Sequence, residues 1–140
     1  MLNVEFDGVP VLKSLKKRQL KQQLFQLIEQ EGKKMGDVSI VFCSDEHLLE
    51  VNRKYLNHDY YTDIITFDYS KDKLVSGDLI ISLDRLRENA GVIQVSLNHE
   101  LHRVVFHGVL HLCGYKDKMK SDKVQMTSKE NFYLQFFQIA

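Results

Sequence analysis

Two short runs of the chain, Ile64-Ile65-Thr66-Phe67 and Leu79-Ile80-Ile81-Ser82, are almost continuously apolar. This character is typical of strands that are buried on both faces of a sheet. Segments with a helical spacing of apolar residues precede and follow them. Because strands and helices alternate along the chain, we expect an α/β fold in which helices pack on one sheet.

Two more strands and about five helices complete the expected fold. Alternating apolar residues predict strands at residues 4–6 and 38–42. The expected helices occupy residues 12–31, 44–56, 83–89, 96–113 and 122–137. Ser44 is the expected N-cap of the second helix, and Gly114 ends the fourth. No linker rich in Pro, Gly or Ser divides the chain, so we expect residues 1–140 to form a single domain with a small four-stranded sheet.

Composition excludes several classes of protein. The 140 residues carry 19 Lys plus Arg and 19 Asp plus Glu, so the formal net charge is zero, unlike that of a histone or a basic tail. No apolar run approaches the roughly 20 residues of a membrane span, and the N-terminus does not resemble a secretory signal. Cys43 and Cys113 lie in apolar contexts and are expected to be buried thiols of a reducing compartment. We therefore expect a cytoplasmic protein without a membrane partner.

The segment from His107 to Asp117 contains the residues that predict a metal site. Residues four apart on a helix differ by about 40° in direction, so His107 and His111 point into the same volume. Gly114 ends the helix, and Asp117 follows close enough to offer a carboxylate oxygen. Two imidazoles and a carboxylate suit zinc, and three protein ligands leave one position open for water, as in catalytic zinc sites.

The residue after His107 argues against one class of metal enzyme. Metalloproteases of the His-Glu-x-x-His type carry their general base at that position, and here it is Gly108. The general base that this mechanism of peptide hydrolysis requires is therefore absent from that position. A histidine pair that only packs or faces solvent is the alternative without a metal.

Several motifs, in order along the chain, resemble those of the YbeY family of bacterial single-strand-specific metallo-endoribonucleases. The segment His107-Gly108-Val109-Leu110-His111-Leu112-Cys113-Gly114-Tyr115 resembles the family signature. The matching segments before and after it are Asn52-Arg53-Lys54-Tyr55, Thr62-Asp63-Ile64-Ile65-Thr66-Phe67, Gly77-Asp78-Leu79-Ile80-Ile81-Ser82, and the pair Met126 and Glu130. The resemblance spans most of the chain.

The resemblance implies an α/β fold with a small mixed sheet, and one zinc ion held by His107 and His111. It implies an enzyme that acts in maturation of the 3′ end of 16S (small-subunit) ribosomal RNA and in ribosome quality control. The usual third ligand of the family is a histidine ten residues past the first, and here that position is Asp117. We read Asp117 as the third ligand, because a carboxylate oxygen ligates zinc at a distance similar to that of an imidazole nitrogen.

A second departure concerns a phosphate contact. The family has an arginine after the tyrosine of its Asn-x-x-Tyr motif, and here that position is Leu56. Arg53 lies one helical turn earlier. Our hypothesis is that Arg53 contacts the phosphate instead.

Three functions remain open from the sequence. The first is a zinc-dependent single-strand endoribonuclease whose partners are ribosomal RNA and the ribosome or its proteins. The second is a ribosome-associated maturation factor with a structural zinc and little or no catalysis, which the missing arginine favours. The third is a metallohydrolase with another substrate, because a metal site alone does not choose among phosphodiesters, esters and amides.

Overall fold

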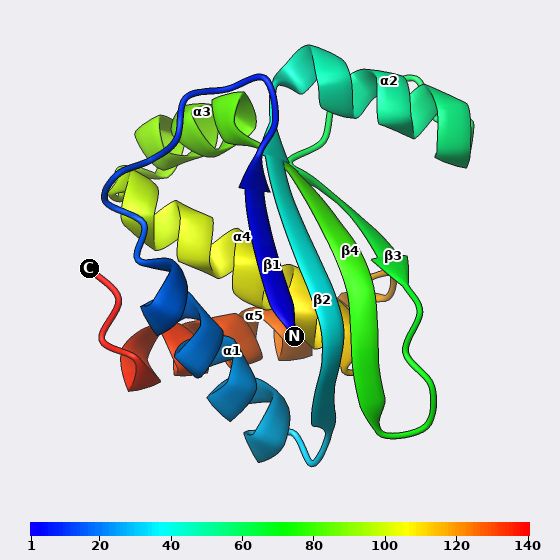
Figure 1. Ribbon diagram of the computed structural model, residues 1–140, viewed down its shortest axis with the longest axis vertical. Coiled ribbons are helices and arrows are strands. Elements are labelled where there is room, and N and C mark those ends of the chain that lie inside the picture. Colours follow the sequence, from blue (N-terminus) through cyan, green and yellow to red (C-terminus); the bar gives the residue numbers. More distant parts are fainter.

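The computed structural model describes residues 1–140 as one sheet with five helices (Figure 1). The strands are β1 (Leu2–Phe6), β2 (Lys34–Cys43), β3 (Ile64–Asp68) and β4 (Leu74–Ser82). The helices are α1 (Lys17–Gln30), α2 (Asp45–Leu56), α3 (Leu83–Ile93), α4 (Leu97–Leu112) and α5 (Lys120–Phe136). The strand order is β1-β2-β4-β3. Because β1, β2 and β4 are parallel and β3 is antiparallel to β4, the sheet is mixed, as expected.

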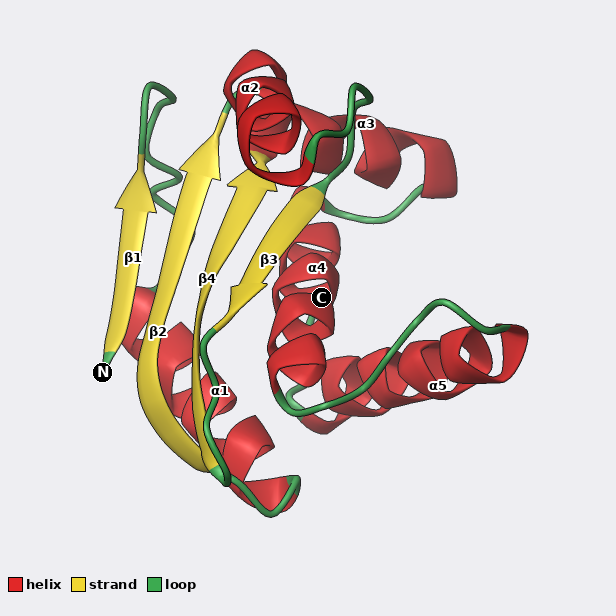
Figure 2. Cartoon of the chain, turned by 90° about the vertical axis from the view of Figure 1, so that its right-hand side faces the viewer, coloured by secondary structure: helices red, strands yellow, loops and turns green.

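The main hydrophobic core lies on the face of the sheet that α1 and α4 cover, and α5 packs against α4 (Figure 2). Alternate residues of the central strands, such as Ile40 and Leu79, are fully buried there against Leu24 of α1 and Val105 of α4. The opposite face is covered only toward one end, where Leu48 of α2 packs in a small cluster with strand residues. The strand order makes β3 an edge strand, and a cavity lies on each of its faces.

Several boundaries differ from those expected. The first helix begins at Lys17 rather than at residue 12. Leu12 and Leu15 pack against the core from a turn in which the Leu15 amide donates to the Leu12 carbonyl at 3.1 Å. Apolar residues of this turn therefore continue the helical pattern of the sequence although they lie outside the helix. The strand expected at residues 38–42 starts earlier, at Lys34, and α3 continues past residue 89 to Ile93.

The cap and thiol predictions are confirmed. The Ser44 hydroxyl accepts a hydrogen bond from the His47 amide at 3.1 Å at the start of α2. Cys43 and Cys113 are free and buried, and burial raises the pKa of both thiols to about 12. None of the helices combines the length and the apolar character that crossing a membrane requires.

Candidate metal centre

Helix α4 positions the two predicted histidine ligands. Its N-cap Ser96 accepts a hydrogen bond from the His99 amide at 2.9 Å, and ten of its residues are buried. A Cβ atom at Gly108 would lie 2.8 Å from Ile64 Cδ1 and 2.9 Å from Leu79 Cδ2. The missing side chain therefore lets α4 approach the sheet closely. This contact fixes the rotation of the helix about its axis, and with it the direction of His107 and His111.

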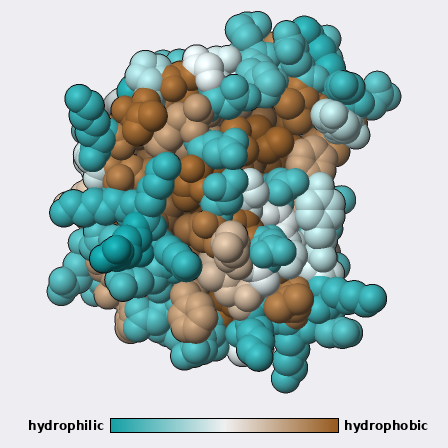
Figure 3. All heavy atoms as spheres, viewed as in Figure 1, coloured by the Kyte–Doolittle hydropathy of each residue, from teal (hydrophilic) through white to brown (hydrophobic).

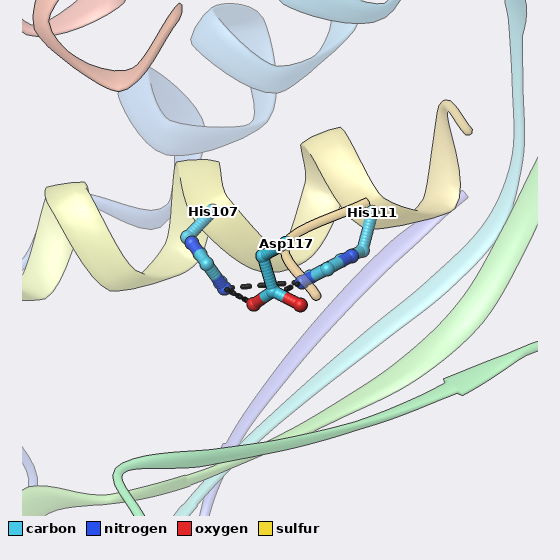
Figure 4. Close-up of side chains that lie close together, drawn as sticks. All are labelled: His107, His111 and Asp117. Carbon is cyan, nitrogen blue, oxygen red and sulfur yellow. Dashed lines mark hydrogen bonds and ion pairs between the residues drawn. The ribbon is translucent and has the colours of Figure 1, made fainter. Parts of the chain in front are cut away.

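The chain reverses direction directly after α4. Gly114 has a φ of +108°, which side chains rarely allow. The Tyr115 amide donates to the Leu110 carbonyl at 3.1 Å, which closes the end of the helix. This reversal returns Asp117 to the face of α4 that carries the histidines (Figure 4).

Three ligand atoms converge at one point. His107 Nε2 and His111 Nε2 lie 3.1 Å apart. Asp117 Oδ2 lies 3.1 Å from His111 Nε2 and 3.3 Å from His107 Nε2. The structure therefore brings together all three residues that the sequence suggested as ligands, with a quarter or less of each histidine side chain and 40% of the aspartate side chain exposed.

The other nitrogen of each imidazole has a hydrogen-bond acceptor of its own. His107 Nδ1 donates to Glu130 Oε2 at 2.6 Å, and His111 Nδ1 donates to the Tyr115 carbonyl at 2.9 Å. Because both partners are hydrogen-bond acceptors, each neutral ring carries its hydrogen on Nδ1 and a lone pair on Nε2. In the neutral rings, two lone pairs and a carboxylate oxygen thus face one another, an arrangement that a cation satisfies, whether it is a proton or a metal ion.

The spacing fits a tetrahedral zinc site. With ligands about 2.0–2.1 Å from the ion at tetrahedral angles, the ligand atoms lie about 3.3 Å from one another. Burial alone lowers the pKa of His107, but the hydrogen bond and the charge of Glu130, with the charge of Asp117, raise it above its ordinary value. The site therefore attracts positive charge, whether it comes from a proton or from a metal ion.

Glu130 is the functional residue that sequence reasoning did not assign. It is 4% exposed and lies on α5, 23 residues from His107. Arg103 donates to Glu130 at 3.2 Å and to the buried Glu100 at 2.6 Å and 2.7 Å. Asp63 lies 3.9 Å from Arg103, and its pKa is raised because burial outweighs the attraction of this arginine. This network holds Glu130 in the orientation that the His107 hydrogen bond requires.

Glu31, whose side chain is 8% exposed, holds the turn that carries Asp117. The Tyr115 hydroxyl donates to Glu31 at 2.5 Å, and Tyr133 of α5 donates to the same carboxylate. Lys129 completes the group at 3.2 Å. Since the Tyr115 carbonyl also accepts the His111 hydrogen bond, Glu31 is connected to the ligand set through one residue.

The ligand atoms open into a cleft of about 530 Å³ between β3, α4 and the segment after α2, which we call the metal cleft. It is lined by Asn52, Leu56, His58, Tyr60, Thr62, Asp63, Ile64, Ile65, Thr66, Asp68, His107, His111, Asp117 and Lys118. Three of these residues are aspartates, whereas the ionisable basic groups besides the ligands are Lys118 and His58. Without a metal ion, this cleft is therefore unfavourable for a polyanion.

Arg53, the predicted phosphate contact, lies elsewhere. Its Nε atom is bonded to Asp59 on the surface, and Arg53 is not among the residues that line the metal cleft. Leu56, at the position of the family arginine, does line it. A phosphate contact by Arg53 would require it to leave Asp59, so its role stays a prediction.

Comparison with known proteins gives consistent results. Residues 9–138 match the family model described as Endoribonuclease YbeY. A protein named Endoribonuclease YbeY from Parabacteroides distasonis is 52% identical over 120 residues, which cover 86% of this chain and 84% of that protein. A protein of the same name from Bacteroides thetaiotaomicron is 48% identical over 125 residues, which cover 89% of this chain and 90% of that protein.

A solved structure has the same fold. The solution structure of a Thermotoga maritima protein aligns with a TM-score of 0.68 at 26% sequence identity. The alignment covers 98% of this chain and 89% of the other.

Proposed function

Since this chain belongs to the YbeY family of endoribonucleases, which are RNA-cleaving hydrolases, we propose that it is a zinc-dependent endoribonuclease specific for single-stranded RNA. Its proposed role is maturation of the 3′ end of 16S ribosomal RNA and ribosome quality control in the cytoplasm, with the ribosome or its proteins as partners. Residues 1–140 act as a single domain in this proposal.

One observation carries the proposal: the Nε2 atoms of two imidazoles and a carboxylate oxygen meet in a cleft that is open to solvent. His107, His111 and Asp117 would hold the ion. When bound, a zinc ion in such a site lowers the pKa of water to about 7 and neutralises negative charge on a phosphoryl oxygen. The three protein ligands and the open cleft favour a catalytic over a structural site, because structural zinc sites are closed by four protein ligands.

The chain's own residues prepare the site for an anionic substrate. Glu130 and the Tyr115 carbonyl keep both Nδ1 atoms protonated, so the Nε2 atoms stay available. Lys118 is positioned in the metal cleft beside Asp117 to attract a phosphate. Arg53 is a further proposed phosphate contact if substrate displaces Asp59 from it.

A maturation factor with a structural zinc is the second candidate. Two observations favour it: Leu56 replaces the arginine of the family motif, and Arg53 is already paired with Asp59. A metallohydrolase for esters or peptides is the third, and it is disfavoured because Gly108 leaves no general base next to His107.

Cleavage assays distinguish the three candidates. We expect zinc-loaded protein to cut single-stranded 16S ribosomal RNA but not its duplex, and the activity to disappear in His111→Ala. RNA binding without cleavage would support the maturation factor, and hydrolysis of esters or peptides alone would support the third candidate. Elemental analysis of the wild type and of Asp117→Ala identifies the metal and its stoichiometry. An unchanged cleavage rate and RNA affinity in Arg53→Ala would exclude Arg53 as a phosphate contact.

A further inference from the structure

A second cavity lies on the other side of β3 from the metal cleft. It has a volume of about 630 Å³ and is formed by α2 and strands β3 and β4, and we call it the aromatic pocket. Its lining includes Tyr55, Phe67 and Tyr69, with Lys54, Glu50 and Asp78 among them. None of these six residues belongs to the metal centre or to the networks behind it.

The aromatic rings of this pocket are presented to solvent. Tyr55 and Tyr69 are each 61% exposed. The rings of Tyr55 and Phe67 meet edge to face at 6.0 Å, and the Lys54 ammonium lies 5.3 Å from the centre of the Tyr55 ring. Figure 3 shows apolar atoms gathered beside α2 on this face of the sheet, bordered by more polar residues. Clustered exposed apolar surface in a concavity marks a binding site more often than isolated exposed residues do.

The aromatic pocket and the metal cleft share the elements that form their walls. On β3, Thr66 and Asp68 line the metal cleft, whereas Phe67 between them lines the aromatic pocket. On α2, Leu56 faces the cleft and its neighbour Tyr55 faces the pocket. Because β3 is the edge strand, a chain that leaves the cleft can cross this edge and reach the pocket without passing through the protein.

We propose that the aromatic pocket binds an unpaired nucleobase of the RNA strand whose phosphodiester lies in the metal cleft, a few nucleotides away along that strand. The inference rests on the proposed endoribonuclease function. Aromatic side chains stack on any base, which suits a nuclease for single strands. The Asp78 and Glu50 carboxylates offer acceptors for exocyclic amino groups, and Lys54 offers a cation for the adjoining phosphate.

The chemistry of the lining favours a nucleobase over an apolar protein segment. Two carboxylates, a lysine and His47 surround the rings, so an aliphatic side chain would leave these polar groups without partners. A base carries both an aromatic face and hydrogen-bonding edges. It can also be delivered by the same molecule that the metal cleft binds, so the pocket needs no separate partner.

The test uses substrates of increasing length. Single-stranded oligonucleotides with one cleavable site are extended stepwise on each side, and KM and kcat are measured with zinc-loaded wild type. We expect KM to fall in one step, on one side only, when the strand becomes long enough to reach the aromatic pocket. Tyr55→Ala and Tyr69→Ala should each reduce this step, because loss of a stacking ring weakens base binding by about 5- to 150-fold.

Control variants distinguish the loss of base stacking from misfolding and from the loss of an exposed aromatic ring elsewhere. Tyr69→Phe keeps the ring and should retain the step. Phe25→Ala removes a ring of similar exposure on α1, away from both cavities, and should retain it as well. The fluorescent base 2-aminopurine, placed at the position where the step occurs, should be quenched on binding to the wild type and less so on binding to Tyr69→Ala.

Three results would overturn the proposal. They are a wild-type KM that does not change with length, a step that survives both alanine variants, and a step that Phe25→Ala removes equally. If the wild type cleaves none of the oligonucleotides, the endoribonuclease function itself fails. Cleavage in which KM does not fall as the oligonucleotide is lengthened refutes only the nucleobase site.

Discussion

The candidate metal centre has two halves that are held in place very differently. His107 and His111 lie on α4, whose buried face belongs to the main core and whose Gly108 packs closely against side chains of β3 and β4. Asp117 lies in a turn outside any helix or strand and is 40% exposed. The turn is tied to the body of the protein through Tyr115 and Glu31. The histidine half is thus fixed by the fold, whereas the aspartate half depends on a few polar contacts.

Removing one ligand from each half tests this comparison most directly. We expect His111→Ala to lower zinc affinity by more than about 100-fold, because one of two fixed imidazoles is lost and the Tyr115 carbonyl loses its donor. Asp117→Ala should lower the affinity less, since the two histidines remain oriented. Competition with a chelator of known affinity measures both. An equal loss in the two variants would show that the aspartate turn is as rigid as the helix.

Glu130 is expected to give the next largest effect. In Glu130→Gln, the amide can hydrogen-bond His107 but no longer supplies the charge that stabilises its orientation and basicity. Substitution of such a carboxylate behind a histidine ligand typically costs about 10- to 100-fold in metal affinity. Glu29→Gln, at an exposed position of α1, is the matched control. Zinc affinity equal to that of the wild type would show that α4 alone orients His107.

Glu31 tests the aspartate half without touching a ligand. Glu31→Gln weakens the hydrogen bonds from Tyr115 and Tyr133 and the ion pair with Lys129. A hydrogen bond to a charged group contributes about 1.5–3 kcal/mol. We expect the free energy of unfolding of Glu31→Gln to be lower than that of the wild type by about 1.5–3 kcal/mol in total. The effect on zinc affinity should stay below about tenfold. Urea unfolding with and without zinc measures both quantities.

The same carboxylate makes a pH-dependent contribution. Burial raises the pKa of Glu31, but the hydrogen bonds from Tyr115, Tyr133 and Lys129 outweigh it and hold the pKa below the ordinary 4.5. A lowered pKa in the folded state means that stability is present above pH 4.5 and is lost as the pH falls through the folded value. The difference in unfolding free energy between the wild type and Glu31→Gln should therefore shrink below pH 4.5. A constant difference would contradict this assignment.

The smallest effect is expected from Asp117→His. An imidazole ligates zinc at a distance similar to that of a carboxylate oxygen, and an exposed turn can adjust to the longer side chain. We expect the zinc affinity of Asp117→His to stay within about tenfold of the wild-type value. A loss as large as that of Asp117→Ala would show that the turn is fixed for a short side chain, and would weaken the comparison.

The same division explains what the sequence could predict. The histidine pair, the helix stop at Gly114 and the return of Asp117 depend on local geometry within 11 residues, and the structure brings these residues together as expected. Glu130 could not be connected with His107, because only the packing of α5 against α4 brings the two together across 23 residues. Glu31 and Tyr115 are separated by 84 residues and meet for the same reason.

The errors in the fold prediction also arise where tertiary contacts override a local pattern. Leu12 suggested an earlier start for α1, yet it packs against the core from a turn that precedes the helix. Arg53 is one helical turn from Leu56, as predicted, but the pairing with Asp59 depends on a loop whose conformation the residue pattern does not specify. Spacing along a helix gives the direction of a side chain but not its partner.

Gly108 also limits which reactions could be engineered into this site. A methyl group at this position would already press on the ends of Ile64 and Leu79, and a glutamate would have to fit, charged, between α4 and the sheet. Converting this site into a peptidase by placing the usual glutamate after the first histidine would therefore require α4, or the side chains of Ile64 and Leu79, to shift. In this architecture, close packing and peptidase chemistry compete for the same position, so any route to protein cleavage would have to recruit its proton acceptor from another element.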